Sequence, residues 1–246
     1  MPFRCNYCGG YFCEEHRLPE FHDCTGLYRQ RRNIFTGTAP EASFFGSGRT
    51  DSRSRRPRFW FSNVELRNLG IALLIIVSIP VVWLWNQLFR NPLITLGAVI
   101  VFAMAFLFHE LAHKFSAQRL GYWAEFRLNR MGLIITLLSF LSPLKVVAPG
   151  AVMIAGVRDW DDYGRISLSG PVTNIAQGII FLVLYWLRVA PVLGYIGMIV
   201  NSSLALFNLI PFGVFDGAKI IKWDWRRWLI AFVTALGIYL YSTVIP

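Results

Sequence analysis

The sequence predicts an all-α protein that crosses a membrane several times, preceded by a small domain rich in cysteine and histidine. Hydrophobic residues make up 55% of its 246 residues, and the mean hydropathy is +0.47. Uncharged apolar runs long enough to cross a bilayer recur along the chain. All of the cysteines, in contrast, lie within the first 24 residues. The composition therefore separates a polar head from a membrane-embedded body.

Three regions follow from this contrast. We expect a metal-binding domain at 1–27, a flexible basic linker at 28–66 and a membrane domain at 67–246, because Gly, Ser, Thr and Arg without apolar periodicity fill the middle region. The N-terminus, MPFRCNYCGG, is polar and does not have the pattern of a signal peptide. Within the membrane domain we expect about five spans, near residues 69–89, 93–112, 171–187, 192–212 and 228–245.

Segment 131–157 is apolar but is interrupted by Pro143 and Lys145. It is too short for two spans of about 20 residues each, so it forms either one span or a re-entrant hairpin. With the N-terminus in the cytoplasm, a hairpin leaves only Arg90 and Arg188 of the basic residues in outside loops, whereas a full span would turn the downstream basic loops outward. We therefore predict a hairpin, in a multi-pass cell-membrane protein with a cytoplasmic N-terminus. Its short apolar pieces could offer a strand edge to an extended peptide.

The stretch LFHELAHK, at 107–114, closes the charge-free run 93–108 and contains the H-E-x-x-H spacing of zinc proteases. On a helix, His109 and His113 share one face, so both imidazoles can reach one zinc ion. Glu110 follows His109 directly and could act as general base on a metal-bound water without being a ligand. Ionisable side chains at the end of a membrane span are costly and usually mark a functional site.

A catalytic zinc ion needs a third protein ligand, and the membrane domain contains no further histidine. The acidic candidates near apolar helices are Glu125, Asp159, Asp161, Asp162, Asp216 and Asp224. Asp216 is favoured because it closes NLIPFGVFDGAK, directly after a span that runs in the same direction as the one that carries HELAH. The predicted topology therefore brings His109, His113 and Asp216 to the same membrane face.

HELAH together with NLIPFGVFDG, an N-x-x-P-x-x-x-x-D-G pattern, resembles the site-2 protease family of intramembrane zinc metalloproteases over residues 69–246. The resemblance implies peptide-bond cleavage inside the membrane. It implies His109, His113 and Asp216 as zinc ligands, and it implies Glu110 as the catalytic acid and base.

Two further motif positions carry over from this resemblance. SGPVTN, at 169–174, resembles the family's motif in an intervening span, so Asn174 is a candidate donor to the substrate carbonyl or to the developing oxyanion. An asparagine near the start of a helix can also simply hydrogen-bond locally. Asn208 and Pro211 match the second motif, where they would shape the loop that presents Asp216.

The N-terminal cluster contains the ligand-type residues Cys5, Cys8, Cys13, His16, His22 and Cys24. Close C-x-x-C spacing lets two thiolates bind one tetrahedral zinc ion. CGGYFCEEHRLPEFHDC resembles the second half of the AN1-type zinc finger, which in its complete form holds two zinc ions in a cross-braced arrangement, but the first C-x-x-C pair of that module is missing. The resemblance implies one complete structural site formed by Cys5, Cys8, His22 and Cys24. Cys13 and His16 would be a half site, either empty or completed by another chain.

The predicted function is therefore an intramembrane zinc metalloendopeptidase with one catalytic zinc ion and one or two structural ones. Its expected partners are a transmembrane protein substrate, the lipid bilayer and a protein bound by the finger. The +10 net charge does not by itself indicate a nucleic-acid partner, since no aromatic-interleaved basic motif accompanies it. Two alternatives stay open: a non-proteolytic zinc-binding membrane protein or transporter, and a membrane-anchored adaptor that works through its zinc finger.

Overall fold

The computed structural model describes residues 59–139, 149–157 and 159–244, and in the N-terminal region Phe3, Arg4, Cys5, Tyr11, Phe12, His16, His22 and Cys24. The chain divides into two compact units, Met1–Arg55 and Arg56–Pro246, and the division lies within the predicted linker. In the first unit, β1 (Phe3–Arg4) pairs antiparallel with β2 (Tyr11–Phe12).

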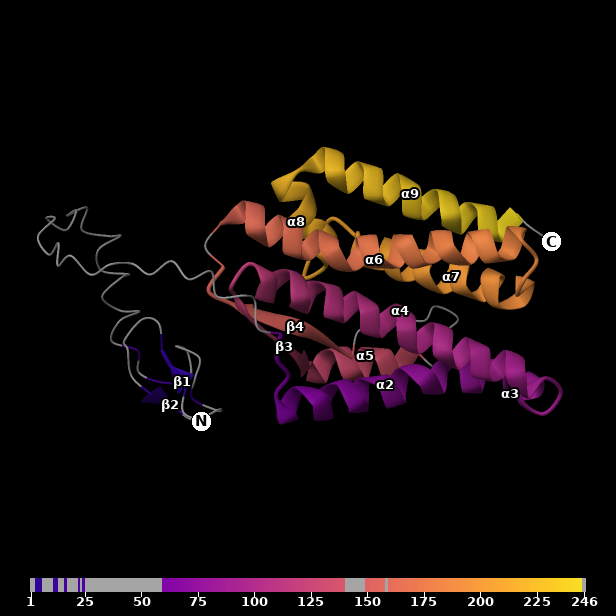
Figure 1. Ribbon diagram of the computed structural model, residues 1–246, viewed down its shortest axis with the longest axis horizontal. Coiled ribbons are helices and arrows are strands. Elements are labelled where there is room, and N and C mark those ends of the chain that lie inside the picture. The colour runs from indigo at the N-terminus through magenta and orange to yellow at the C-terminus, as the bar shows by residue number, and fades with distance from the viewer. Residues whose placement is uncertain are drawn as a thin grey trace, which may run out of the picture. The chain divides into compact units, whose positions relative to one another are not determined.

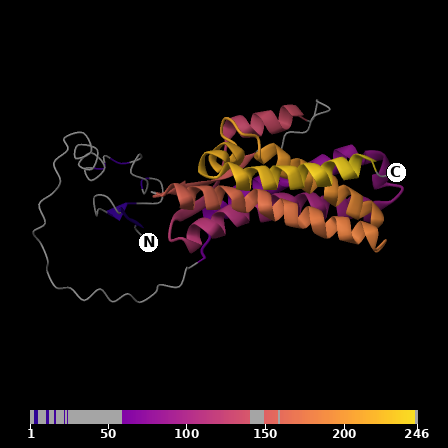
Figure 2. The same cartoon turned by 90° about the horizontal axis from the view of Figure 1, so that it is seen from above.

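The second unit is a bundle of helices. Five of its described helices are long and apolar enough to cross a membrane: α2 (Asn63–Trp83), α4 (Pro92–Arg119), α6 (Trp160–Trp186), α7 (Pro191–Asn208) and α9 (Trp225–Val244). These helices lie side by side with their axes roughly aligned (Figures 1 and 2). Three shorter helices accompany them: α3 (Trp85–Leu88), α5 (Arg130–Ser139) and α8 (Asp216–Trp223). The prediction of a polytopic, largely helical membrane protein is confirmed.

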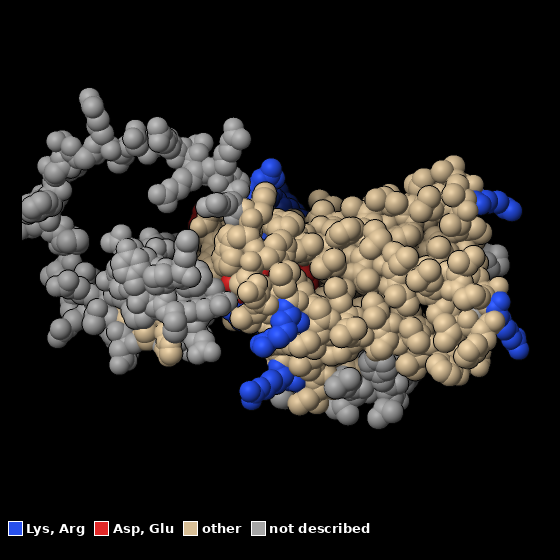
Figure 3. Space-filling view, turned by 60° about the horizontal axis from the view of Figure 1, so that its bottom comes forward, with Lys and Arg blue, Asp and Glu red and all other residues tan. Residues whose placement is uncertain are grey.

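Charged side chains keep to the ends of this bundle. On the face shown in Figure 3, basic side chains gather towards both ends, and a broad uncharged surface lies between them. Large apolar side chains on the long helices are exposed, among them Leu74, Ile180 and Ile230. Such a band is expected where lipid, and not water, surrounds the helices.

Local signals set where the helices begin. Proline occupies the first position of α4 and of α7, where its missing N–H costs no helical hydrogen bond. The Asp159 carboxylate accepts a hydrogen bond from the Asp161 N–H (3.0 Å) and caps the start of α6. We predicted that this span begins at residue 171, where the apolar run begins. Helix α6 begins earlier, at Trp160, because the Asp159 cap and not the apolar run determines its first residue.

A two-stranded antiparallel sheet lies beside the helices, formed by β3 (Trp123–Leu128) and β4 (Gly150–Ala155). The all-α prediction did not include this sheet. Segment 131–157 is not a single spanning helix: most of α5 occupies its start and β4 lies near its end. The residues between Ser139 and Pro149 lie outside the described part of the chain.

The outer edge of β4 is identified by the hydrogen bonds of β3. The Phe126 N–H donates to Glu65 Oε1 (3.0 Å) and so points away from β4. In an antiparallel pair the opposite residue behaves likewise, so the N–H and C=O of Val152 point away from β3, as do those of Gly150 and Ile154. Within the described residues this sheet has two strands, so β4 presents an unpaired edge.

A buried ion pair fixes α2 against α4. Lys114 and Glu65 are both nearly fully buried and contact each other directly. The Lys114 ammonium also lies 3.7 Å from the ring centroid of Phe61. Because Lys114 directly follows His113, this pair anchors the part of α4 that carries the HELAH motif.

Candidate metal centre

Three predicted ligands converge in the second unit. His113 Nε2 lies 3.1 Å from His109 Nε2 and 3.0 Å from Asp216 Oδ2, and His109 Nε2 lies 3.8 Å from the same carboxylate oxygen. All three side chains are buried. The structure therefore brings together the two histidines of α4 and the first residue of α8, as the predicted topology required.

The turn between α7 and α8 delivers Asp216 to the histidines. Helix α7 ends at Asn208, and the chain reverses through Gly213, whose φ of +69° is a left-handed conformation that favours glycine. The Leu209 carbonyl accepts a hydrogen bond from the Trp228 indole N–H (2.7 Å), which ties the turn to α9.

The proton positions on both imidazoles follow from their partners. His113 Nδ1 lies 2.8 Å from the Ile166 carbonyl oxygen, which can only accept, so Nδ1 carries the proton. His109 Nδ1 lies 2.5 Å from the Asn174 side-chain oxygen and carries a proton for the same reason. The Nε2 atom of each neutral ring then directs a lone pair towards Asp216.

This donor set fits a zinc ion. Two lone pairs and a carboxylate oxygen within 4.8 Å of one another repel unless a cation lies among them. Ligand atoms about 2.1 Å from a tetrahedral zinc ion lie about 3.4 Å apart, and the observed separations lie on either side of that value. Two histidines and one carboxylate are also a known ligand set of catalytic zinc, in which the fourth position stays open.

Helix α6 passes so close to the imidazoles that only glycine fits. A Cβ atom at Gly170 would overlap the rings of both His109 and His113. The close approach of the two imidazole rings therefore explains why the SGPVTN motif has glycine at position 170.

Glu110 is buried beside the three ligands but does not belong to the group that could share one ion. Its carboxylate is hydrogen-bonded to the backbone of Val152. Glu110 therefore lies between the metal centre and the unpaired edge of β4, where it can act on a proton without occupying the metal.

Asn174 lies at the centre, and its side chain is hydrogen-bonded to three partners. Its side-chain nitrogen donates to the Ala105 carbonyl (3.0 Å) and to Asn201 Oδ1 (3.0 Å), while its oxygen faces His109. Both N–H groups of the amide are thus engaged, so donation to a substrate oxyanion would require breaking one of these bonds. The arrangement supports an orienting contact with His109, and donation to a substrate stays a prediction.

The other acidic candidates for the third ligand have partners elsewhere. Glu125 pairs with Arg127, Asp159 caps α6, and the Asp162 carboxylate accepts from the Tyr122 hydroxyl. Asp161 accepts from the Trp223 indole, and Asp224 accepts from the Arg226 N–H. Asn208, expected to shape the loop, donates to the Leu204 carbonyl of its own helix (3.0 Å).

Sequence reasoning missed two residues at this centre. Lys219 donates to Asp216 Oδ1 (3.1 Å), which leaves Oδ2 directed at the histidines. Asn201 is fully buried in α7 and bonded to Asn174. A polar residue within an apolar span was the signal that could have identified Asn201.

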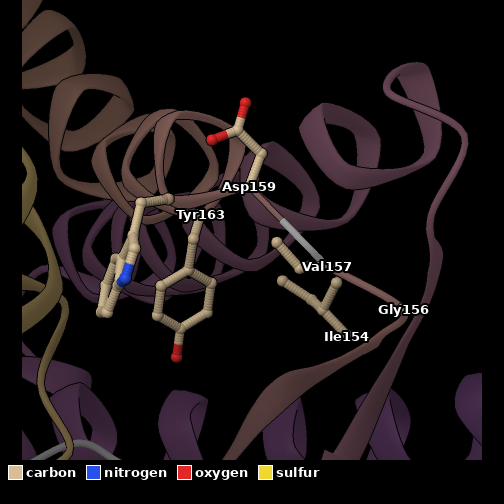
Figure 4. Close-up of a pocket in the computed structure, with 6 residues that line it drawn as sticks. Ile154, Gly156, Val157, Asp159 and Tyr163 are labelled. Atoms are coloured by element: carbon tan, nitrogen blue, oxygen red, sulfur yellow. The ribbon is translucent and has the colours of Figure 1, made fainter. Parts of the chain in front are cut away.

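A cavity of about 330 Å³ lies near the end of β4, lined by Ile154, Gly156, Val157, Asp159, Trp160 and Tyr163. In Figure 4 the Tyr163 ring and the side chains of Val157 and Ile154 lie on one side, and the Asp159 carboxylate points away from them. Lys219 Nζ lies 5.7 Å from the Tyr163 ring centroid, which connects this region to Asp216.

The first unit holds a second group of ligand-type side chains. Cys5, His22 and Cys24 offer ligand atoms within 4.8 Å of one another, and the two sulfur atoms are 3.7 Å apart. His22 Nδ1 lies 2.7 Å from the backbone oxygen of His16, so Nε2 remains for a metal. Cys8 and Cys13, the other predicted cysteine ligands, lie outside the described residues.

Comparison with known proteins agrees with both groups. Residues 1–29 match the family model of the AN1-like zinc finger. A protein of Methanocaldococcus jannaschii named "Putative zinc metalloprotease" is 33% identical over 201 residues, which cover 74% of this chain and 96% of that protein. No solved structure matches the chain. The chain therefore belongs to the zinc metalloprotease family of this relative, as a membrane protein with an AN1-like zinc finger at its N-terminus.

Proposed function

We propose that this protein hydrolyses peptide bonds within membrane-spanning segments of other proteins, as a site-2-type intramembrane protease. One observation carries the proposal: His109 and His113, on a helix long and apolar enough to cross a membrane, meet Asp216, which begins the short helix α8 between two other helices of that kind, α7 and α9. Helix α4 is about 42 Å long, and His109 lies about 15 Å from its C-terminal end, which is within reach of the hydrocarbon region.

The chain supplies distinct roles for the reaction. His109, His113 and Asp216 would hold the metal. A zinc ion held there supplies a Lewis acid for the substrate carbonyl and for the attacking water. Glu110 takes a proton from that water and passes it to the leaving amine. Burial of the carboxylate among apolar helices keeps bulk water from competing for the proton.

The edge of β4 suits an unwound substrate. A membrane-spanning helix satisfies its own backbone hydrogen bonds, so unwinding it within the bilayer leaves N–H and C=O groups without partners. The outward-facing N–H and C=O groups of Gly150 and Ile154 and the C=O of Val152 could replace those bonds by pairing with an extended segment, while the Val152 N–H stays bonded to Glu110. Because Val152 is bonded to Glu110, such a segment would pass directly beside the base.

The N-terminal finger completes the proposed organisation. We place it in the cytoplasm, since most basic residues then lie on the cytoplasmic side. Cys5, Cys8, His22 and Cys24 would hold a structural zinc ion, and the finger would bind a protein that selects or regulates substrates.

The test compares the purified wild-type protein with Glu110→Gln in proteoliposomes. The substrates are a panel of single-span membrane proteins tagged at both ends, with unfolded casein as a soluble comparison. We expect cleavage within the apolar segment, located by mass spectrometry, and a loss of at least about 100-fold in Glu110→Gln. Zinc content should stay unchanged, because Glu110 is not one of the grouped ligands.

Three outcomes would contradict the proposal. Equal cleavage by the wild type and the variant would remove Glu110 from the chemistry. Cleavage of casein but of no spanning segment would indicate a protease that acts at the membrane surface. Zinc uptake into the vesicles without any cleavage would favour the transporter alternative.

A further inference from the structure

We infer that Asn201 of α7 is a positioning residue for the metal centre and acts on His109 through Asn174. The inference rests on the proposed function in so far as His109 is a metal ligand. Asn201 and Asn174 are each fully buried, and they connect three of the long helices at the depth of His109.

Two backbone carbonyls decide how both amides are oriented. The Ala105 carbonyl can only accept a hydrogen bond, so the group of Asn174 that faces it, at 3.0 Å, is the NH₂. The Gly197 carbonyl, 2.9 Å from Asn201, likewise faces the NH₂ of that side chain. Neither amide can flip without placing two oxygen atoms against each other.

The hydrogen bonds then run in one direction through the bundle. His109 donates from Nδ1 to Asn174, Asn174 donates to Asn201, and Asn201 donates to the Gly197 carbonyl. This direction leaves the lone pair of His109 on Nε2, on the side of Asp216. The α7 backbone thus helps the Ala105 carbonyl to set the proton position of a histidine on α4, through two neutral side chains.

Neutral amides suit this task in a membrane. Metal-bound histidines usually donate their second N–H to a carboxylate, a carbonyl or water, and such partners fix ring orientation. A carboxylate here would add a buried charge among apolar helices, which is costly without a paired cation. The two amides fix the ring and the proton without adding charge.

Loss of Asn201 would leave one N–H of Asn174 without its acceptor in a buried site. The Ala105 carbonyl would then be the one remaining acceptor that orients the Asn174 NH₂, and because the terminal torsion of asparagine is broad, the amide would be held less firmly. Any orientation that turns NH₂ towards His109 Nδ1 moves the ring proton to Nε2, where it blocks the metal. We therefore expect a weaker metal site and not merely a less stable helix.

The experiment measures zinc affinity in the full-length protein by competition with a chelator. The His109→Ala variant defines the zinc that belongs to the finger, so the difference between it and each other variant reports this centre alone. We expect Asn201→Ala and Asn201→Ser to bind about 10- to 100-fold more weakly. Serine keeps the bond to the helix carbonyl, as Ser202 does with Met198 (2.6 Å), but is too short to reach Asn174. Asn201→Ser therefore separates the loss of the hydrogen bond to Asn174 from any loss of helix stability.

Two variants serve as references. Ser202→Ala removes a buried polar group of the same helix that has no bond to Asn174 and should keep wild-type affinity. Asn201→Asp, neutral when protonated in an apolar site, offers the same acceptor and donor and should recover most of the affinity. In the cobalt-loaded protein, the visible spectrum of the centre should change in Asn201→Ser and stay constant in Ser202→Ala.

Wild-type zinc affinity in both Asn201→Ala and Asn201→Ser would overturn the inference. An equal loss in Ser202→Ala would also overturn it, because the effect would then be a general loosening of α7. If the affinities follow the expected order but no spanning segment is cleaved, the proposed protease function is wrong, whereas the positioning role of Asn201 is supported.

Discussion

The chain places ligand-type side chains together in two ways. In the N-terminal unit, Cys5, His22 and Cys24 come from one short stretch of chain. In the membrane unit, His109 and His113 come from α4, and Asp216 comes from α8. More than half of the residues of the membrane domain lie between these ligands in the sequence. A local cluster can close around a metal and stabilise a small fold, whereas a site gathered from several helices can keep a coordination position open for chemistry.

The surroundings differ in the same sense. The membrane centre has a buried carboxylate, Glu110, beside its ligands, and an amide, Asn174, that orients one of them. The described residues of the finger show cysteine and histidine ligands without an acidic neighbour in the group. This contrast predicts that metal at the membrane centre is needed for activity, whereas metal in the N-terminal finger is needed for structure.

Removing a ligand from each site gives the largest expected effects and tests this contrast directly. Asp216→Ala should lose one zinc ion per chain, as measured by elemental analysis, and all cleavage activity, because two histidines alone hold zinc weakly. Cys5→Ser should lose one zinc ion, with cleavage by the membrane unit retained. Loss of activity in Cys5→Ser would show that the two sites do not divide the tasks in this way.

Gly170→Ala tests the close approach of α6 to the imidazoles. The added Cβ would overlap both rings, so we expect zinc affinity and cleavage to fall by at least about tenfold. Gly178→Ala is the matched control on the same helix, since its Cβ would meet only ordinary contacts at 3.6 Å or more. Equal behaviour of the two variants, in zinc titrations and thermal unfolding, would refute the steric argument.

Lys219→Met tests the contact that holds the second oxygen of Asp216. Without the ammonium group, Oδ1 loses its partner and the carboxylate can rotate, so zinc affinity should fall by about tenfold. Lys219→Arg should recover much of the loss because a cation returns. Lys222→Met, on the same helix, is the control for loss of charge alone.

Deleting residues 1–58 is expected to have the smallest effect on the chemistry. The membrane unit is compact by itself from Arg56, so it should still bind zinc at its own centre and cleave a spanning segment. Substrate choice should change if the finger binds a selecting protein. A truncated protein that is folded, as judged by circular dichroism, but inactive would favour the adaptor alternative.

Local patterns predicted the parts of the site that depend on short spacing. The four-residue interval between His109 and His113 places both rings on one helix face in any helical fold. The direction of the spans, derived from the distribution of basic residues, selected Asp216 from several acids. The long helices followed from apolar length, although caps such as Asp159 moved their ends.

The sequence by itself therefore determined the spans, the ligand types and the two metal-binding groups, because these depend on composition and on spacing within one element. Only the tertiary structure decided that β3 and β4 pair, that Gly170 must lack a side chain, and that Asn174 is fully engaged. Each of these depends on contact between segments distant in the chain, and hydrophobic periodicity does not record such contacts. The LFHELAHK stretch indicated a metal, but the helices packed around it determine how its histidines are held.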